Sequence, residues 1–232
     1  MGRLEELNRI NEVPVLSVFG PEFREFGRIV PGIAAAGLFR YMENETPVPE
    51  EGNIYVPSDP ELERLPGIAE IRGTVFGGMD IQAGYCNGRN TTYNGFEYHK
   101  SPEVNAAVSD FMLVLGRCSD ISDELSYSVD LAKVFYVPRG TVIELFGTTL
   151  HLSPVRTCPE GFRCVVILPR GTNTPLSEEE RAAARSAVIR GDKEARLLLQ
   201  KHKWVIAHPE REPLIRQGAY PGVTGPNREL RS

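Results

Sequence analysis

The chain has 232 residues, a formal net charge of −5, 41% apolar residues and 25% charged residues, which is ordinary for a globular protein. This length fits one large domain with additions and does not require two separate cores. The negative charge argues against nucleic acid or an anionic membrane as the main partner. No stretch approaches the roughly 20 apolar residues of a membrane helix, and the charged N-terminus lacks the apolar segment of a secretory signal, so we expect a cytoplasmic protein.

The first 66 residues predict an N-terminal arm with short strands and a loop. Residues 3–11 have leucine and isoleucine at three-residue spacing, which favours a short helix. The β-branched run VPVLSVF predicts a first strand, and the alanines within residues 31–40 favour a short helix. Residues 43–66 are rich in Pro, Glu and Asn around the short β-like run NIYVP, which indicates a long surface loop.

Residues 67–170 predict a barrel of short strands separated by turns. Gly77-Gly78 and Asn87-Gly88 are expected turns, since such pairs favour hairpins. Seven or more strands at this spacing are typical of a sandwich or barrel. Apart from the strand that carries Glu97 and His99, the predicted strands have the sequences AEIRGTVFG, MDIQAGYCNGRN, DFMLVLG, KVFYVP, TVIELF, TLHLSPV and FRCVVILP.

Residues 171–232 predict a helical C-terminal appendage on the barrel. Ser177 and Glu180 form a capping-box pattern, so a helix is expected over 178–189 and should stop at Gly191. Asp192 can cap a second helix that ends near His202. A strand or extended lid then begins at Trp204, and the tail is rich in Gly and Pro.

A candidate metal site begins in the stretch FEYHKSPEV. Glu97 and His99 are two residues apart, and strand side chains alternate, so both should point to one face. Glu103 follows Pro102, which can turn the chain and bring a third ligand round. Carboxylate and imidazole are ligands of divalent first-row metals, and Mn, Fe, Zn or Ni would suit this set.

A second stretch, VFYVPRGTVIELFGTTLHL, adds two candidates. Glu144 and His151 lie in strand-like surroundings, separated by a Gly-Thr-Thr turn. A carboxylate in the apolar run VIELF would be costly unless paired or metal-bound, so Glu144 is expected to be either a ligand or a base. His202 and His208 are expected to be structural.

These two stretches together resemble the motifs of the cupins. The first cupin motif is a glycine, a His-x-His pair, a glutamate and a later glycine; the second is Pro-x-Gly followed by a histidine. The positions that match the two motifs are Gly95, Glu97, His99, Glu103, Gly116, Pro138, Gly140 and His151. Glu97 replaces the first histidine, and Ile143 stands where the second motif has its histidine, with Glu144 beside it.

The resemblance covers residues 72–170 and implies an all-β core, a double-stranded jelly-roll barrel. The chain looks most like a bacterial cupin family of unknown function that carries the landmarks EYH, PxGT and TTLH. The resemblance implies a metal held by Glu97, His99, Glu103 and His151, and a small-molecule substrate bound in the barrel mouth.

The main functional hypothesis is a sugar isomerase or epimerase similar to metal-dependent cupins. Glu144 or Glu103 would shuttle a proton through an enediol, with Lys100 as a further catalytic candidate. A lyase resembling ureidoglycolate lyase is the alternative, followed by a dioxygenase or a non-catalytic sugar-binding cupin. A homodimer is expected, because a partner often covers open jelly-roll edges.

Four further residues are candidates for substrate binding. Tyr85 and Asn94 flank the metal strand and are expected to orient hydroxyl groups. Arg139 and Arg163, like Lys100, are expected to hold an anionic group of the substrate, with a plain surface role as the alternative.

Overall fold

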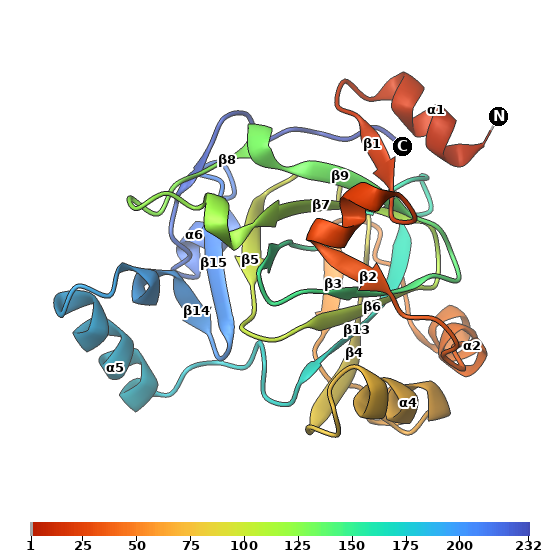
Figure 1. Ribbon diagram of the computed structural model, residues 1–232, viewed down its shortest axis with the longest axis horizontal. Coiled ribbons are helices and arrows are strands. Elements are labelled where there is room, and N and C mark those ends of the chain that lie inside the picture. The colour runs from red at the N-terminus through yellow and green to blue at the C-terminus, as the bar shows by residue number, and fades with distance from the viewer. Residues whose placement is uncertain (1) are drawn as a thin grey trace.

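Two β-sheets facing each other form the centre of the protein (Figure 1), whose computed structural model describes residues 2–232. The five-stranded sheet has the order β1-β9-β7-β11, with β12 also paired to β7. Its strands are β1 (Val15–Ser17), β7 (Phe111–Arg117), β9 (Lys133–Val137), β11 (Thr149–Leu150) and β12 (Val155–Arg156). The six-stranded sheet contains, in spatial order, β2 (Gly27–Ile29), β10 (Val142–Leu145), β6 (Glu103–Ala107), β13 (Phe162–Pro169), β4 (Ile81–Gly88) and β3 (Asn53–Val56).

Smaller sheets and helices surround these two layers. The small sheets contain β5 (Gly95–Tyr98), β14 (Leu198–Gln200) and β15 (Lys203–Ala207), and the pair β8 (Tyr127–Ser128) and β16 (Val223–Thr224). The α-helices are α1 (Arg3–Ile10), α2 (Ala36–Glu45), α3 (Pro60–Glu63), α4 (Pro66–Thr74), α5 (Glu178–Ile189) and α6 (Glu212–Arg216). The 3-10 helices are η1 (Pro21–Glu25), η2 (Cys118–Asp120), η3 (Val129–Leu131) and η4 (Lys193–Leu197).

The main core lies between the two large sheets and follows the two-residue period of the strands. On β7, Phe111 and Leu113 point inward, while Met112 and Val114 face the opposite side. Phe135 on the neighbouring strand β9 joins the same inner cluster and is fully buried. Because successive strand side chains alternate, both faces of β7 are buried, the second under α1, β5 and β8.

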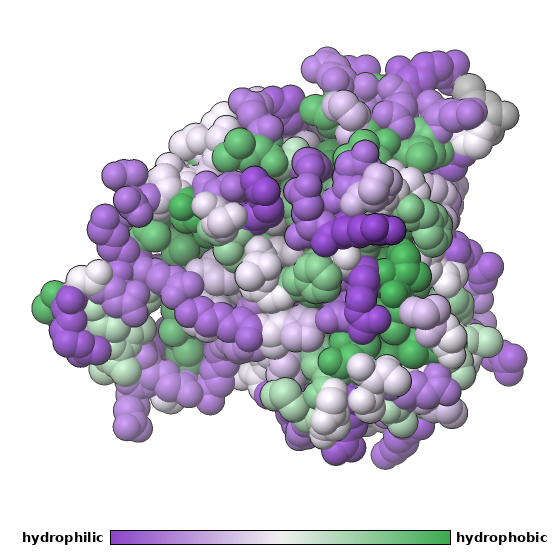
Figure 2. All heavy atoms as spheres, viewed as in Figure 1, coloured by the Kyte–Doolittle hydropathy of each residue, from purple (hydrophilic) through white to green (hydrophobic). Residues whose placement is uncertain are grey.

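A second apolar cluster covers the outer face of the six-stranded sheet. Ile81, Ala83 and Tyr85 of β4 pack there against buried residues of α2 and α4, such as Leu38 and Ile71. These two helices lie beside that sheet in Figure 1. On the face drawn in Figure 2, hydrophilic side chains dominate and strongly hydrophobic ones gather between β2 and α4. The helices thus shield one side of the sheet from water.

Most predicted elements are confirmed, including the all-β jelly-roll core. Helix α5 has the predicted bounds, and its capping box between Ser177 and Glu180 is formed in both directions. Gly77 and Gly78 make a turn, with φ of 59° and 85°, which glycine adopts readily, but this turn joins α4 to β4 and not two strands of a hairpin. No helix within residues 2–232 has both the length and the apolar character to span a membrane.

Four local predictions are wrong. Residues 69–77 were expected to be a strand but lie mostly in α4, where Pro66 begins the helix and Ile68 and Ile71 are buried. The expected loop over 43–66 contains the helix α3, although its β-like run NIYVP does form β3. Asn87-Gly88 is no turn, since both residues pair within β4. The expected helix over 192–202 ends at Leu197, where the chain enters β14.

The terminal segments contribute to the same sheets as the middle of the chain. Residues 15–56 supply β1 to one large sheet and β2 and β3 to the other. From the C-terminal segment, β15 pairs with β5 along the strand that carries Glu97. This pairing brings residues 198–207 against the predicted site.

Candidate metal centre

Backbone pairing places the predicted ligands of the two motifs next to each other. Glu97 lies in β5, His99 follows that strand, and Glu103 begins β6. His151 follows β11 and is joined to Glu97 by an antiparallel bridge with N–H···O distances of 2.6 and 2.9 Å. The bridge fixes which residue of the second motif faces β5, so the side chains converge.

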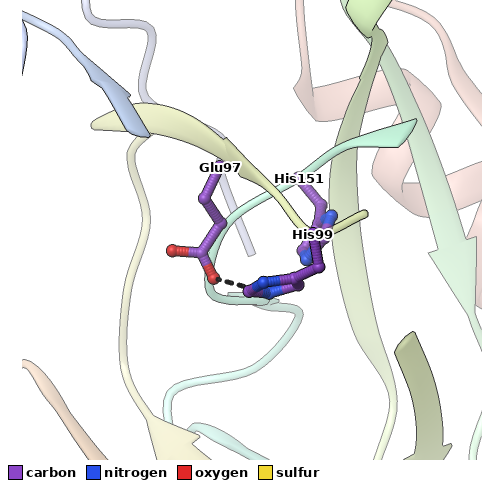
Figure 3. Close-up of side chains that lie close together, drawn as sticks. All are labelled: Glu97, His99 and His151. Carbon is purple, nitrogen blue, oxygen red and sulfur yellow. Dashed lines mark ion pairs between the residues drawn. The ribbon is translucent and has the colours of Figure 1, made fainter. Parts of the chain in front are cut away.

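Glu97, His99 and His151 each offer a ligand atom, and these atoms all lie within 4.8 Å of one another (Figure 3). Glu103 lies against the same group: its Oε2 is 3.3 Å from Nε2 of His151 and 3.4 Å from Nε2 of His99. The His99 Nε2 to Glu97 Oε1 distance is 3.8 Å. All four residues are buried.

The hydrogen bonds of the two imidazoles show which nitrogen faces the group. Nδ1 of His99 donates to the carbonyl oxygen of His202 at 2.6 Å, and Nδ1 of His151 donates to that of Thr149 at 3.0 Å. In a neutral imidazole the other nitrogen then carries a lone pair, so both Nε2 atoms present lone pairs toward carboxylate oxygens. Such acceptors repel one another unless a proton or a metal cation lies between them.

The donor set fits a divalent metal. Nε2 of His99 is buried and has no hydrogen-bond partner among the described residues. Ligands around a tetrahedral metal at about 2.0 Å are separated by about 3.3 Å, close to the two Glu103 distances. Backbone carbonyls that fix the Nδ1–H of each histidine are the usual outer support of metal-binding imidazoles. His99, His151, Glu97 and Glu103 are therefore the residues that would hold the ion.

Without a metal, a proton takes the position between the imidazole and the carboxylate. Burial lowers the pKa of His151, but the facing carboxylate of Glu103 outweighs it and raises the pKa to about 9. Burial acts to raise the pKa of Glu103, yet the charge of His151 holds it well below its usual range. Buried imidazolium and buried carboxylate thus stabilise each other.

Two polar side chains orient the carboxylates. Lys203 Nζ lies 2.5 Å from Oε2 of Glu97, and their side chains are only 16% and 10% exposed. The amide of Asn105 donates to Oε1 of Glu103 at 2.8 Å. The outward oxygen of Glu97 is thus held by a cation, and that of Glu103 by a neutral amide.

A pocket of about 320 Å³ opens onto this group. Two carboxylates, two cations and several amides share its wall with a few apolar side chains. The polar lining consists of Glu97, Glu103, Lys203, Arg211, Asn53, Asn94, Asn105, Asn173, Gln217, Tyr55 and Ser153. A small, polar ligand suits this surface better than an apolar one.

The structure brings together Glu97, His99, Glu103 and His151, and it places Asn94 in the pocket wall. It does not bring Glu144 there, which corrects the expectation that Glu144 is a ligand or a base. Ile143 and Leu145 point into the core, so Glu144 faces outward and pairs with Arg28 at 2.6 Å. The carboxylate has a partner, as its apolar surroundings required, but the partner is an arginine.

Four other candidates also lie outside the pocket lining. Lys100 pairs with a glutamate of η4 at 2.7 Å and lies over the ring of Trp204. Arg139 pairs with Glu43 of α2 at 2.6 Å. Tyr85 packs under the helices on the outer sheet face, and Arg163 stands at the start of β13. Lys100 and Arg139 are held away from the site by nearer charge partners. Tyr85 and Arg163 lie on strands, where the alternation of side chains directs them to the other face.

Sequence reasoning missed Lys203, Asn105, Tyr55 and Asn173, which also line the pocket. A buried carboxylate at Glu97 needs a positive partner, so the sequence allows the prediction that some Lys or Arg lies beside it. The pattern KHKW does not show which of its two lysines pairs with Glu97, because only the pairing of β15 with β5 places Lys203 there.

Comparisons with solved structures give weak likenesses to larger proteins. The vicilin of Solanum melongena is 15% identical with a TM-score of 0.35, and the match covers 73% of this chain and 46% of that one. Oxalate decarboxylase from Bacillus subtilis, a protein with Mn(II) centers, is 12% identical with a TM-score of 0.32, covering 59% and 36%. This chain thus spans less than half the length of either protein, and likenesses this weak support no inference about activity.

A comparison with curated proteins found no match. The model of one protein family, described as a domain of unknown function (DUF4867), matches residues 15–228. The matched range includes both motifs, all four residues of the candidate metal centre and the C-terminal strand that supports it. The chain therefore belongs to the DUF4867 family.

Proposed function

We propose that this protein is a divalent-metal-dependent enzyme acting on a small polar substrate, and that its reaction is the isomerisation or epimerisation of a sugar or sugar derivative. The observation that carries the proposal is the geometry of His99 and His151: a backbone carbonyl holds each Nδ1, and each Nε2 faces the buried carboxylate of Glu103 on the wall of an open pocket. A bound divalent ion would polarise a carbonyl and its neighbouring hydroxyl as a Lewis acid.

The protein residues would handle the proton and the orientation of the substrate. Glu103 is the proposed proton-transfer group, since it lines the pocket and its Oε1 is held by Asn105. Its place between the imidazoles also suits a ligand, so the two roles need a direct test. Glu144 has no part in this proposal, because it lies on the outer face paired with Arg28.

Metal content is the first test. Elemental analysis of the purified protein should find about one equivalent of Mn, Fe, Zn or Ni, which His99→Ala and His151→Ala should both lose. Glu144→Gln is the matched control and should retain the metal, because its carboxylate lies outside the group. A wild type that stays free of metal after supplementation would refute the proposal.

The chemistry is tested by proton exchange with solvent. Aldoses, ketoses and sugar acids are incubated with metal-loaded protein in D₂O, and deuterium at the carbon next to the carbonyl is followed by NMR. The proposal expects incorporation with at least one of these compounds, lost in Glu103→Gln with metal retained. If Glu103→Gln loses the metal, Glu103 is a ligand and not the base. Cleavage without exchange would favour the lyase alternative, and binding without turnover would favour a sugar-binding protein.

A further inference from the structure

The pocket wall carries two cations that the proposed chemistry does not use. Lys203 is mostly buried and forms an ion pair with Glu97. Arg211, from the turn before α6, is exposed and lines the same pocket. The other charged side chains that line the pocket are Glu97 and Glu103.

The balance of charge in this pocket favours an anion. When a divalent cation is bound, the carboxylates of Glu97 and Glu103 together neutralise it. The charges of Lys203 and Arg211 then remain without a counter-charge in the lining. Confined positive charge at a pocket with partly apolar walls attracts an anionic ligand.

A second pair of residues offers hydroxyl-binding groups on the same wall. Asn173 is buried, and its Oδ1 has no hydrogen-bond partner among the residues the structure describes. Its Nδ2 donates to the hydroxyl oxygen of Tyr55 at 2.6 Å, which leaves the Tyr55 O–H free to donate elsewhere. A buried acceptor without a partner costs free energy, and a ligand hydroxyl would remove that cost.

The position of Asn173 is fixed by the backbone of the hairpin that carries Lys203. Its N–H donates to the carbonyl oxygen of Lys201 at 3.0 Å, and the N–H of Lys201 donates back to Thr174 at 2.9 Å. Asn173 has φ of 66°, a conformation that asparagine tolerates better than most residues. The backbone of Asn173 is therefore held against the turn of the hairpin that carries Lys203, and both residues line the pocket.

From these observations we infer that the pocket takes a small polyhydroxylated carboxylate, a sugar acid, as its substrate class. The carboxylate lies toward Lys203 and Arg211, and hydroxyl groups meet Asn173 and Tyr55. This inference rests on the proposed function for the metal charge. It adds the chemical class of the ligand and the residues that select it.

The test compares compounds of one carbon skeleton by isothermal titration calorimetry, with metal content measured in every sample. D-gluconate should bind metal-loaded protein at least tenfold more tightly than D-sorbitol, which lacks the carboxylate. Arg211→Gln and Lys203→Gln should each reduce that ratio several-fold. The controls are Arg216→Gln and Lys201→Gln, whose side chains pair outside the pocket lining and should leave the ratio unchanged.

Tyr55→Phe separates hydroxyl binding from charge selection. This variant should weaken gluconate and sorbitol alike, by about three- to tenfold, and keep their ratio. Equal affinity for the two compounds, no measurable binding of gluconate, or the same loss in the control variants would overturn the inference. Tighter binding of sorbitol 6-phosphate than of gluconate would overturn the choice of carboxylate.

The outcome is separable from that of the proposed function. Metal bound with a gluconate-to-sorbitol ratio near one refutes the sugar-acid inference and leaves the metal centre intact. A protein that binds no metal refutes the proposed function. In that protein the inference is judged by the same ratio: a ratio near one overturns it, and a retained preference for gluconate supports the cationic subsite.

Discussion

Lys203→Met should destabilise the metal-free protein strongly, because it removes the positive partner of a buried carboxylate. Glu97 is 10% exposed and its Oε2 lies 2.5 Å from Lys203 Nζ. A side chain of similar length without charge leaves the Glu97 carboxylate desolvated and without its cation. Breaking a buried ion pair by removing one partner costs about 3–5 kcal/mol in the free energy of unfolding.

A double-mutant cycle isolates the pairwise part of that loss. Replacing both partners, in Lys203→Met with Glu97→Gln, should cost about 2–3 kcal/mol less than the sum of the two single changes, because no uncompensated charge remains. Added metal should shrink the penalty of Lys203→Met by about 1 kcal/mol or more, since a cation bound at Glu97 replaces part of the missing charge.

Urea unfolding in EDTA, followed by circular dichroism, measures these free energies. Lys201→Met is the matched control: its partner Glu180 lies at 3.1 Å, but both side chains are over 40% exposed, so the expected loss is under about 1 kcal/mol. If Lys203→Met costs no more than Lys201→Met, the buried pair does not stabilise the site and the reasoning fails.

Two further predictions concern pH and packing. The pKa of His151 is raised to about 9 in the folded metal-free protein, so the contribution of its charged form to stability is complete below about pH 6.5 and is lost as the pH rises through 9. In EDTA, the melting temperatures of wild type and His151→Gln should therefore differ less at pH 10 than at pH 6. A difference that stays constant with pH would contradict the coupling of His151 to Glu103. Gly116→Ala should cost about 1–3 kcal/mol, because its Cβ would lie 2.2 Å from the hydroxyl of Tyr127. Gly73→Ala, which meets open space in α4, should be neutral or stabilising, and equal effects of the two alanines in urea unfolding would contradict the packing argument.

The sequence by itself determined most strands of the core and the four residues of the candidate metal centre. The alternation within β7 and β13 is local, and Glu97 and His99 share a face for the same reason. The capping box of α5 depends only on residues three apart. Features of this kind need no knowledge of distant neighbours, so pattern reasoning reached them.

Tertiary structure decided what lies beside those residues. Asn87-Gly88 has the composition of a turn, but strands on both sides pair with it and hold it extended. The same burial that made Glu144 a candidate ligand is satisfied instead by Arg28, from a strand more than 100 positions earlier. Likewise Lys203 reaches Glu97 only because β15 pairs with β5. A buried charge is stable only beside a partner of opposite charge, but the pairing of strands far apart in the sequence decides which residue becomes that partner. Local residue spacing does not predict this pairing.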